Sequence, residues 1–162
     1  AKDAGVFSGD PDGSFRPYSA INRAEVITIA LKAFGLSLYG ADGTNLGWKD
    51  VSIGAWYMPY LRTGKMYGLV AGDAAGTVRP EESVNRVEAL RFIYEAAKKA
   101  GTSSVSACTA NPYSDIYAGE WYFNYVCQAK TDGLFDVSGD NFSPNKLASR
   151  AEIAEALYRL FK

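Results

Sequence analysis

One stretch of sequence decides the fold: GVFSGDPDGSFRPYSAINRAEVITIALKAFGL, residues 5–36, returns twice in altered form. The second copy is GLVAGDAAGTVRPEESVNRVEALRFIYEAAKKAG (68–101), and the third is GLFDVSGDNFSPNKLASRAEIAEALYRLFK (133–162). Three residue types recur at separations of 63 and then 64 residues, namely Pro17, Pro80 and Pro144; Arg23, Arg86 and Arg150; Glu25, Glu88 and Glu152. A fixed period of this length is typical of a repeat protein whose units share a core.

The second and third copies also share an upstream half. WKDVSIGAWYMPYLRTGKMYGL (48–69) matches YSDIYAGEWYFNYVCQAKTDGL (113–134), and four residues return 65 positions later: Asp50, Trp56, Tyr60 and Gly68 as Asp115, Trp121, Tyr125 and Gly133. The first copy begins only at the tail of this half and so lacks the tryptophan-bearing segment. The predicted units are therefore 1–36, without its first helix, 48–101 and 113–162.

Each unit is predicted to be a helix, a loop and a second helix, which makes the chain all-α. The second helix opens with a capping box in all three units: Asn22 with Glu25, Asn85 with Glu88, Ser149 with Glu152. Apolar residues follow at helical spacing, and Gly35 and Gly101 stand where a helix would stop. A single helical hairpin of this size buries too little apolar surface to be stable alone, so the three are expected to pack together.

Composition excludes several functions. The 17 basic and 18 acidic side chains leave a formal charge of −1, which gives no general attraction to nucleic acid or to an anionic membrane. No apolar run approaches the roughly 18–20 residues that span a bilayer, and no signal peptide is seen, so an exported chain is expected to have lost its leader. The chain has no histidine, the commonest general base and zinc ligand. We expect no enzyme activity, no metal site and no cofactor.

Two aspartates and two cysteines have structural interpretations. Asp50 and Asp115 are predicted to be helix caps rather than an acid–base pair. Cys108 lies in the connection before the third unit and Cys127 in that unit's first helix. In an exported protein they are expected to form a disulfide bond, which would close a loop of about 20 residues and contribute about 3 kcal/mol; two buried thiols are the alternative.

The motifs resemble the S-layer homology repeat. That family's pattern is an aspartate-containing opening, a tryptophan-bearing helix, a Gly-Leu pair, a G-x-x-DG-x-F-x-P loop and a T-R-A-E helix start. Here these elements are WKDV and YSDI, the loop GDPDGSFRP, and NRAE, NRVE and SRAE. The resemblance implies a pseudo-threefold spindle around a central helical bundle, whose inter-repeat grooves bind cell-wall polysaccharide. The ligand would be a secondary cell-wall polymer, often pyruvylated, or a glycan linked to peptidoglycan.

Candidate polysaccharide-binding residues follow from that resemblance and from the chemistry of an acidic sugar, which suits arginine forks, helix N-termini and aromatic faces. They are Asp12, Gly13, Arg16, Arg23, Trp56, Asp73, Arg79, Arg86, Trp121 and Arg150. Structural alternatives stay open: the arginines could pair with carboxylates that lock one unit to the next, and the tryptophans could belong to the core. Loop two has Ala75 and Val78, and loop three has Ser143, where the pattern prefers aspartate, phenylalanine and arginine. The groove of loop one with Arg23 is therefore expected to be the best equipped.

Two functions remain. The first is non-covalent anchoring of a surface protein at the extracellular face of a bacterial envelope. The second is a self-assembling subunit of a filament or S-layer lattice, because a bundle with only two of three upstream helices leaves an apolar slot for a second copy.

Overall fold

The computed structural model describes residues 14–40 and 45–162, and this part of the chain is all-helical, with no strand beyond isolated bridges. Its five helices are α1 (Arg23–Ala33), α2 (Met58–Met66), α3 (Arg86–Lys99), α4 (Phe123–Thr131) and α5 (Arg150–Leu160). The helices α1, α3 and α5 are the second helices of the three repeats, and α2 and α4 are the two upstream helices. None of the helices in these two ranges is long and apolar enough to cross a membrane.

The predicted helix starts and stops are confirmed. In α1 the Asn22 side chain accepts from the Glu25 N–H at 2.8 Å, while the Asn22 N–H donates to the Glu25 carboxylate at 2.9 Å. The same reciprocal pair opens α3 and α5. Beyond the helix ends, Gly35 and Gly101 have φ of 62° and 72°, a left-handed conformation that glycine adopts at little cost.

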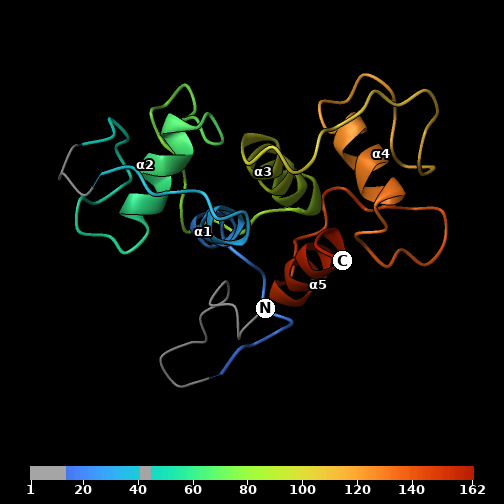
Figure 1. Cartoon of the computed structure of the whole chain (residues 1–162), viewed down its shortest axis with the longest axis horizontal. Coiled ribbons are helices and arrows are strands. Elements are labelled where there is room, and N and C mark those ends of the chain that lie inside the picture. Colours follow the sequence, from blue (N-terminus) through green and yellow to red (C-terminus); the bar gives the residue numbers. More distant parts are fainter. Residues whose placement is uncertain (1–13, 41–44) are drawn as a thin grey trace.

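The two upstream helices flank the three others. Figure 1 shows α2 at one side of the molecule beside α1, and α4 at the other side beside α3, with α5 below α3 in this view. One core cluster joins the repeats through fully buried side chains from four helices, Ile27, Leu61, Ile93 and Ile153. A second cluster lies between α3 and α4 and includes Leu90, Tyr94 and Val126. Burial of these faces is what holds such short helices in place.

A closed ring of backbone hydrogen bonds ties the three repeats together just before their second helices. The Ile21 N–H donates to the Ala148 carbonyl at 2.9 Å, Ala148 donates to Val84 at 3.0 Å, and Val84 donates back to Ile21 at 3.0 Å. All three side chains are fully buried. Because each segment both donates and accepts, no one repeat can leave the ring without breaking two bonds.

A disulfide bond joins Cys108 to Cys127, with the two Cα atoms 6.1 Å apart. It ties the connection after α3 to the middle of α4. Nearby, the Lys130 ammonium lies 4.5 Å from the centroid of the Tyr113 ring, and in the second repeat Lys65 lies 4.9 Å from the centroid of Trp48. The first residues of the second and third repeats are thus fixed to their upstream helices in a similar way.

Candidate functional site

The three repeated arginines form a ring of ion pairs between repeats. Arg23 pairs with Glu88 at 3.0 Å, Arg86 with Glu152 at 2.6 Å, and Arg150 with Glu25 at 2.8 Å. Each arginine is the first residue of its helix, and each glutamate also closes the capping box of another helix. The interpretation of these arginines as locks between units is therefore confirmed; ligand binding by them stays a prediction.

An aromatic ring packs against the guanidinium group of each of the three arginines. The centroid of the nearest ring lies 5.8 Å from Arg23 (Phe92), 5.5 Å from Arg86 (Phe142) and 5.2 Å from Arg150 (Phe15). Arg86 is the most enclosed of the predicted arginines, at 7% exposure, and its guanidinium also donates to the Phe142 carbonyl. The side chains of Arg23, Arg86 and Arg150 are therefore largely enclosed between the repeats.

Four predicted binding residues meet in one groove. Arg23, Asp73, Arg79 and Trp121 all line a cavity of about 290 Å³, together with Thr77, Glu88, Arg91 and Phe92. They come from all three repeats: Arg23 from α1, Asp73 and Arg79 from the loop before α3, and Trp121 from the turn before α4. The groove therefore exists only when the repeats are assembled.

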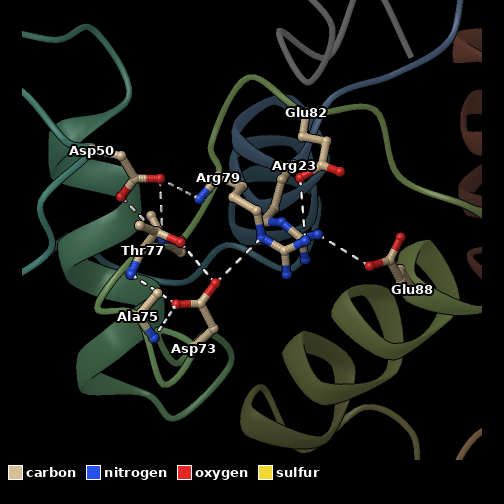
Figure 2. A network of polar contacts seen from close by, with 9 residues as sticks. Arg23, Asp50, Asp73, Ala75, Thr77, Arg79, Glu82 and Glu88 are labelled. Atoms are coloured by element: carbon tan, nitrogen blue, oxygen red, sulfur yellow. Dashed lines mark hydrogen bonds and ion pairs between the residues drawn. The ribbon is translucent and has the colours of Figure 1, made fainter.

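The loop that forms one wall of the groove is organised around Asp73 (Figure 2). Its carboxylate accepts hydrogen bonds from the Thr77 hydroxyl at 2.7 Å, the Ala75 N–H at 2.9 Å and the Thr77 N–H at 3.0 Å. The Arg79 guanidinium lies 3.6 Å away. These hydrogen bonds, led by that from the Thr77 side chain, hold the pKa of Asp73 below its ordinary value, so the carboxylate is ionised at neutral pH.

A second carboxylate fixes the conformation of Arg79. Asp50 accepts from the Val78 N–H at 3.0 Å and from the Arg79 N–H at 2.6 Å (Figure 2). Arg79 has φ of 52°, a left-handed conformation that is unfavourable for a residue with a side chain, and these two bonds help to hold it there. The Arg79 side chain lines the groove from this position.

The prediction that Asp50 and Asp115 cap helices is wrong. Asp115 accepts from the backbone N–H groups of Phe142 and Ser143 at 2.8 and 2.7 Å, as Asp50 does in the repeat before. The helices α2 and α4 begin several residues later, at Met58 and Phe123, so neither aspartate is next to a helix start. Both carboxylates instead tie the upstream half of a repeat to its own loop.

The structural alternative, that Trp56 and Trp121 belong to the core, is wrong. Their exposures are 57% and 54%, because both precede their helices, and each leans against the tyrosine that follows it. The buried tryptophan of this part of the chain is Trp48, at 7% exposure. Trp121 therefore offers an indole face at the rim of the groove.

The remaining candidates are distributed more widely. Asp12 and Gly13 lie outside the described residues. Arg16 is exposed and donates from Nε to the Ser14 hydroxyl at 3.3 Å. The expected combination of loop one with Arg23 is wrong: Arg23 lines the groove of loop two, whereas loop one contributes Phe15 beneath Arg150. The repeats pair cyclically, so each loop faces the arginine of another unit.

The repeat comparison missed one groove residue, Arg91 on α3. Its equivalents in the other repeats are Thr28 and Glu155, so a search for recurring residues could not find it. Within the described ranges Arg91 makes no ion pair, whereas the groove's other arginines face Glu88 and Asp73. Three arginines and two carboxylates therefore line the groove, and Glu82, outside the lining, lies 3.3 Å from Arg79.

Comparisons with known proteins agree with this architecture. The family model described as S-layer homology domain matches residues 1–27, 49–90 and 112–154, the first match being partial. The chain is 29% identical over 162 residues to the surface-layer 125 kDa protein of Lysinibacillus sphaericus, a match covering 97% of this chain and 13% of that protein. It is 32% identical over 130 residues to the cellulosome-anchoring protein of Acetivibrio thermocellus, covering 74% of this chain and 28% of that protein.

An enzyme is among the relatives too. Exoglucanase XynX of Acetivibrio thermocellus is 27% identical over 162 residues, a match that covers 97% of this chain and 14% of the enzyme. The chain thus spans only a small part of each of these proteins. It belongs to the S-layer homology domain family, whose members are repeat modules of cell-surface proteins.

Proposed function

We propose that this chain attaches a protein non-covalently to the bacterial cell wall by binding an envelope polysaccharide in an inter-repeat groove. One observation carries the proposal: Arg23, Arg79, Arg91, Asp73 and Trp121, contributed by all three repeats, line a single groove. Two of the relatives, a surface-layer protein and a cellulosome-anchoring protein, support a place at the extracellular face of the envelope.

The groove's chemistry suits an acidic saccharide. Arg91, which makes no ion pair within the described residues, is the groove arginine best placed to receive a carboxylate, and a guanidinium can hold a carboxylate through two parallel hydrogen bonds. The exposed face of Trp121 can pack against the C–H surface of a sugar ring. A volume of about 290 Å³ lies just below the usual range for ligand pockets, about 300–1,000 Å³, which suits a short stretch of glycan. A secondary cell-wall polymer, pyruvylated or linked to peptidoglycan, has these features.

Binding rather than catalysis is the role that the carboxylates favour. Asp73 is held by two backbone N–H groups and the Thr77 hydroxyl, and Glu88 by Arg23 and its capping box. The hydrogen bonds from Thr77 lower the pKa of Asp73, which is opposite to the raised pKa that a general acid in glycoside hydrolysis requires. The disulfide between Cys108 and Cys127 suits an oxidising, extracellular location.

The cyclic contacts also support the pseudo-threefold spindle as the arrangement of the repeats. The backbone ring through Ile21, Val84 and Ala148 and the ring of three arginine–glutamate pairs both close after three steps. Such closure is expected when equivalent units are arranged around a common axis. The three second helices would then form the central bundle.

Co-sedimentation with purified sacculi tests the anchoring function. We expect the chain to pellet with intact sacculi and to stay in solution after the secondary polymer has been removed chemically. Pelleting that survives removal of the polymer would point to bare peptidoglycan as the ligand, and no pelleting with either preparation would refute anchoring.

A self-assembling subunit remains the second candidate function. The observation that favours it is the exposure of aromatic side chains on α5, where Tyr158 and Phe161 are 58% and 54% exposed. Copies pairing through this face would give a particle mass that rises with concentration in light scattering. A constant monomer mass up to millimolar concentration would refute it.

A further inference from the structure

The C-terminal ends of three neighbouring helices carry exposed lysines. They are Lys32 in α1, Lys65 in α2, and Lys98 and Lys99 in α3. The Lys32 ammonium lies 5.5 Å from the centroid of the Tyr60 ring of α2. The Lys99 ammonium lies 4.9 Å from the centroid of Tyr67, the C-cap of the same helix. The ends of α1 and α3 therefore both meet α2, and the four lysines form one lysine surface around it.

The segment that follows α1 completes the lysine surface. The Tyr67 hydroxyl donates to the Ser37 carbonyl at 3.1 Å, and the Tyr67 ring lies 5.1 Å from the ring of Tyr39. The side chains of Leu38, Tyr39 and Met66 are exposed here. Cations and exposed apolar groups therefore occur together on this part of the molecule.

No acidic residue pairs with these lysines in the part of the chain that the structure describes. Lys65 donates to the Leu46 carbonyl at 2.5 Å, a contact that does not neutralise its charge. The stretches 26–40, 51–72 and 96–114 contain no aspartate or glutamate at all, and Asp42, which follows the first of them, lies outside the described residues. The chain as a whole has a charge of −1, so the lysine surface is a local concentration of positive charge.

The third repeat shows that the fold does not require this charge. Lys32 corresponds to Glu95, 63 positions later, and Tyr67 corresponds to Asp132, 65 positions later. There Glu95 accepts a hydrogen bond from the Tyr125 hydroxyl at 2.7 Å. Lysines in a last helical turn complement the helix dipole, which accounts for each lysine by itself but not for the lack of carboxylates around them. The positive charge is therefore a feature of the second repeat.

We infer that the lysine surface binds a linear polyanion of phosphodiester-linked alditol units. A lysine ammonium is a compact point charge that suits a phosphate oxygen, whereas the planar fork of arginine suits a carboxylate. A polymer fits better than a single anion because the cations come from three helices. The carbon units between its phosphates can pack against exposed side chains such as Tyr39 and Met66.

The lysine surface is separate from the polysaccharide groove. Arg23, which lines the groove, is the first residue of α1, and Lys32 is the tenth, so about 14 Å of helix lies between them. The choice of an envelope polymer rests on the location in the proposed function, but the binding surface does not involve the groove. A bilayer is a poorer partner because α2 buries Met58 and Leu61 and so has no exposed apolar face.

Titration calorimetry with synthetic poly(glycerol phosphate) at several salt concentrations tests this inference. The chain should bind at low salt, with an affinity that falls as salt is added. Lys99→Gln should bind about fivefold more weakly and should lower the slope of log K against log salt by about 0.7, because one phosphate contact is lost. The matched control is Lys130→Gln, which removes a last-turn lysine 4.5 Å from the Tyr113 centroid on α4 and should bind normally.

Trp121→Ala separates this surface from the groove, and it should bind poly(glycerol phosphate) as the unaltered chain does. A loss of binding in Trp121→Ala would place the anion in the groove and overturn the inference. No binding at low salt, or equal losses in Lys99→Gln and Lys130→Gln, would also overturn it.

Three other probes test the chemistry of the partner. Equal affinity for polygalacturonate would show that phosphate is not selected over carboxylate. Tighter binding to single-stranded DNA, or to vesicles of phosphatidylglycerol and phosphatidylcholine, would make nucleic acid or a membrane the partner. Each of these results would overturn the inference, and circular dichroism of the variants shows that they are folded before affinities are compared.

Discussion

The replacement Arg86→Ala, compared with Arg79→Ala, should distinguish an arginine that stabilises the fold from one that is available for binding. Arg86 donates to one Glu152 oxygen from Nε at 3.2 Å and from Nη2 at 2.6 Å, and it also donates to the Phe142 carbonyl. Its guanidinium lies over the Phe135 and Phe142 rings, at 5.6 and 5.5 Å from their centroids. The replacement would remove all these contacts and leave a cavity between two repeats.

The expected loss of stability can be estimated from these contacts. Removing one partner of a buried ion pair typically costs about 3–5 kcal/mol. Glu152 would keep the Lys146 ammonium at 3.1 Å and the Ser149 N–H at 2.9 Å, so the lower value, about 3 kcal/mol, applies. The matched control is Arg79→Ala: its side chain is 52% exposed and its ion pairs measure 3.3 and 3.6 Å, so the loss should stay below about 1 kcal/mol.

Urea unfolding followed by far-UV circular dichroism measures both free energies. Arg86→Ala should lower the midpoint strongly and Arg79→Ala only slightly. If Arg86→Ala cost less than about 1 kcal/mol, the ring of ion pairs would contribute nothing to holding the repeats together, and the structural interpretation of the arginines would fail.

Three further predictions concern stability. Gly72→Ala should destabilise the fold by about 1–3 kcal/mol in the same urea assay, because the new methyl group would meet Trp48 Nε1 at only 2.4 Å; an unchanged midpoint would show that the indole moves freely. Reduction of the bond between Cys108 and Cys127, which are 19 residues apart, should lower the free energy of unfolding by about 3 kcal/mol, whereas a loss near zero would mean that the connection is ordered without it. Burial raises the pKa of Glu152, but hydrogen bonds from Arg86, the Ser149 N–H and Lys146 outweigh it and bring the pKa below its ordinary 4.5. The stability from Glu152 is therefore complete above about pH 4.5 and is lost as the pH falls through the lowered pKa; Glu152→Gln should flatten this part of the pH profile, and an unaltered profile would contradict the assignment.

The fold was predictable from local chemistry. A capping box is a contact between residues three apart, so Asn22 with Glu25 and its two counterparts could be read directly from the sequence. The alternative of a core position for Trp56 failed, because Trp56 precedes α2, which begins at Met58. A tryptophan in a turn has no helical face, and its exposure is set by the turn.

The site was predictable only in part, because it depends on which repeat meets which. The joint recurrence of arginine and glutamate suggested that these residues lock the repeats together. The order of pairing, in which Arg23 meets Glu88 of the next repeat, is a property of the assembled ring. Asp50 shows the same limit, since its partners Val78 and Arg79 are almost 30 positions away.

The measurement that tests the central claim most directly is a binding isotherm of Trp121→Ala with purified sacculi, beside Tyr158→Ala as the matched control. Both side chains are aromatic and more than half exposed, but only Trp121 lines the groove. Loss of its contact surface, about 1.4 kcal/mol, predicts about tenfold weaker binding for Trp121→Ala and wild-type binding for Tyr158→Ala. Wild-type binding by Trp121→Ala would show that the polysaccharide is held elsewhere.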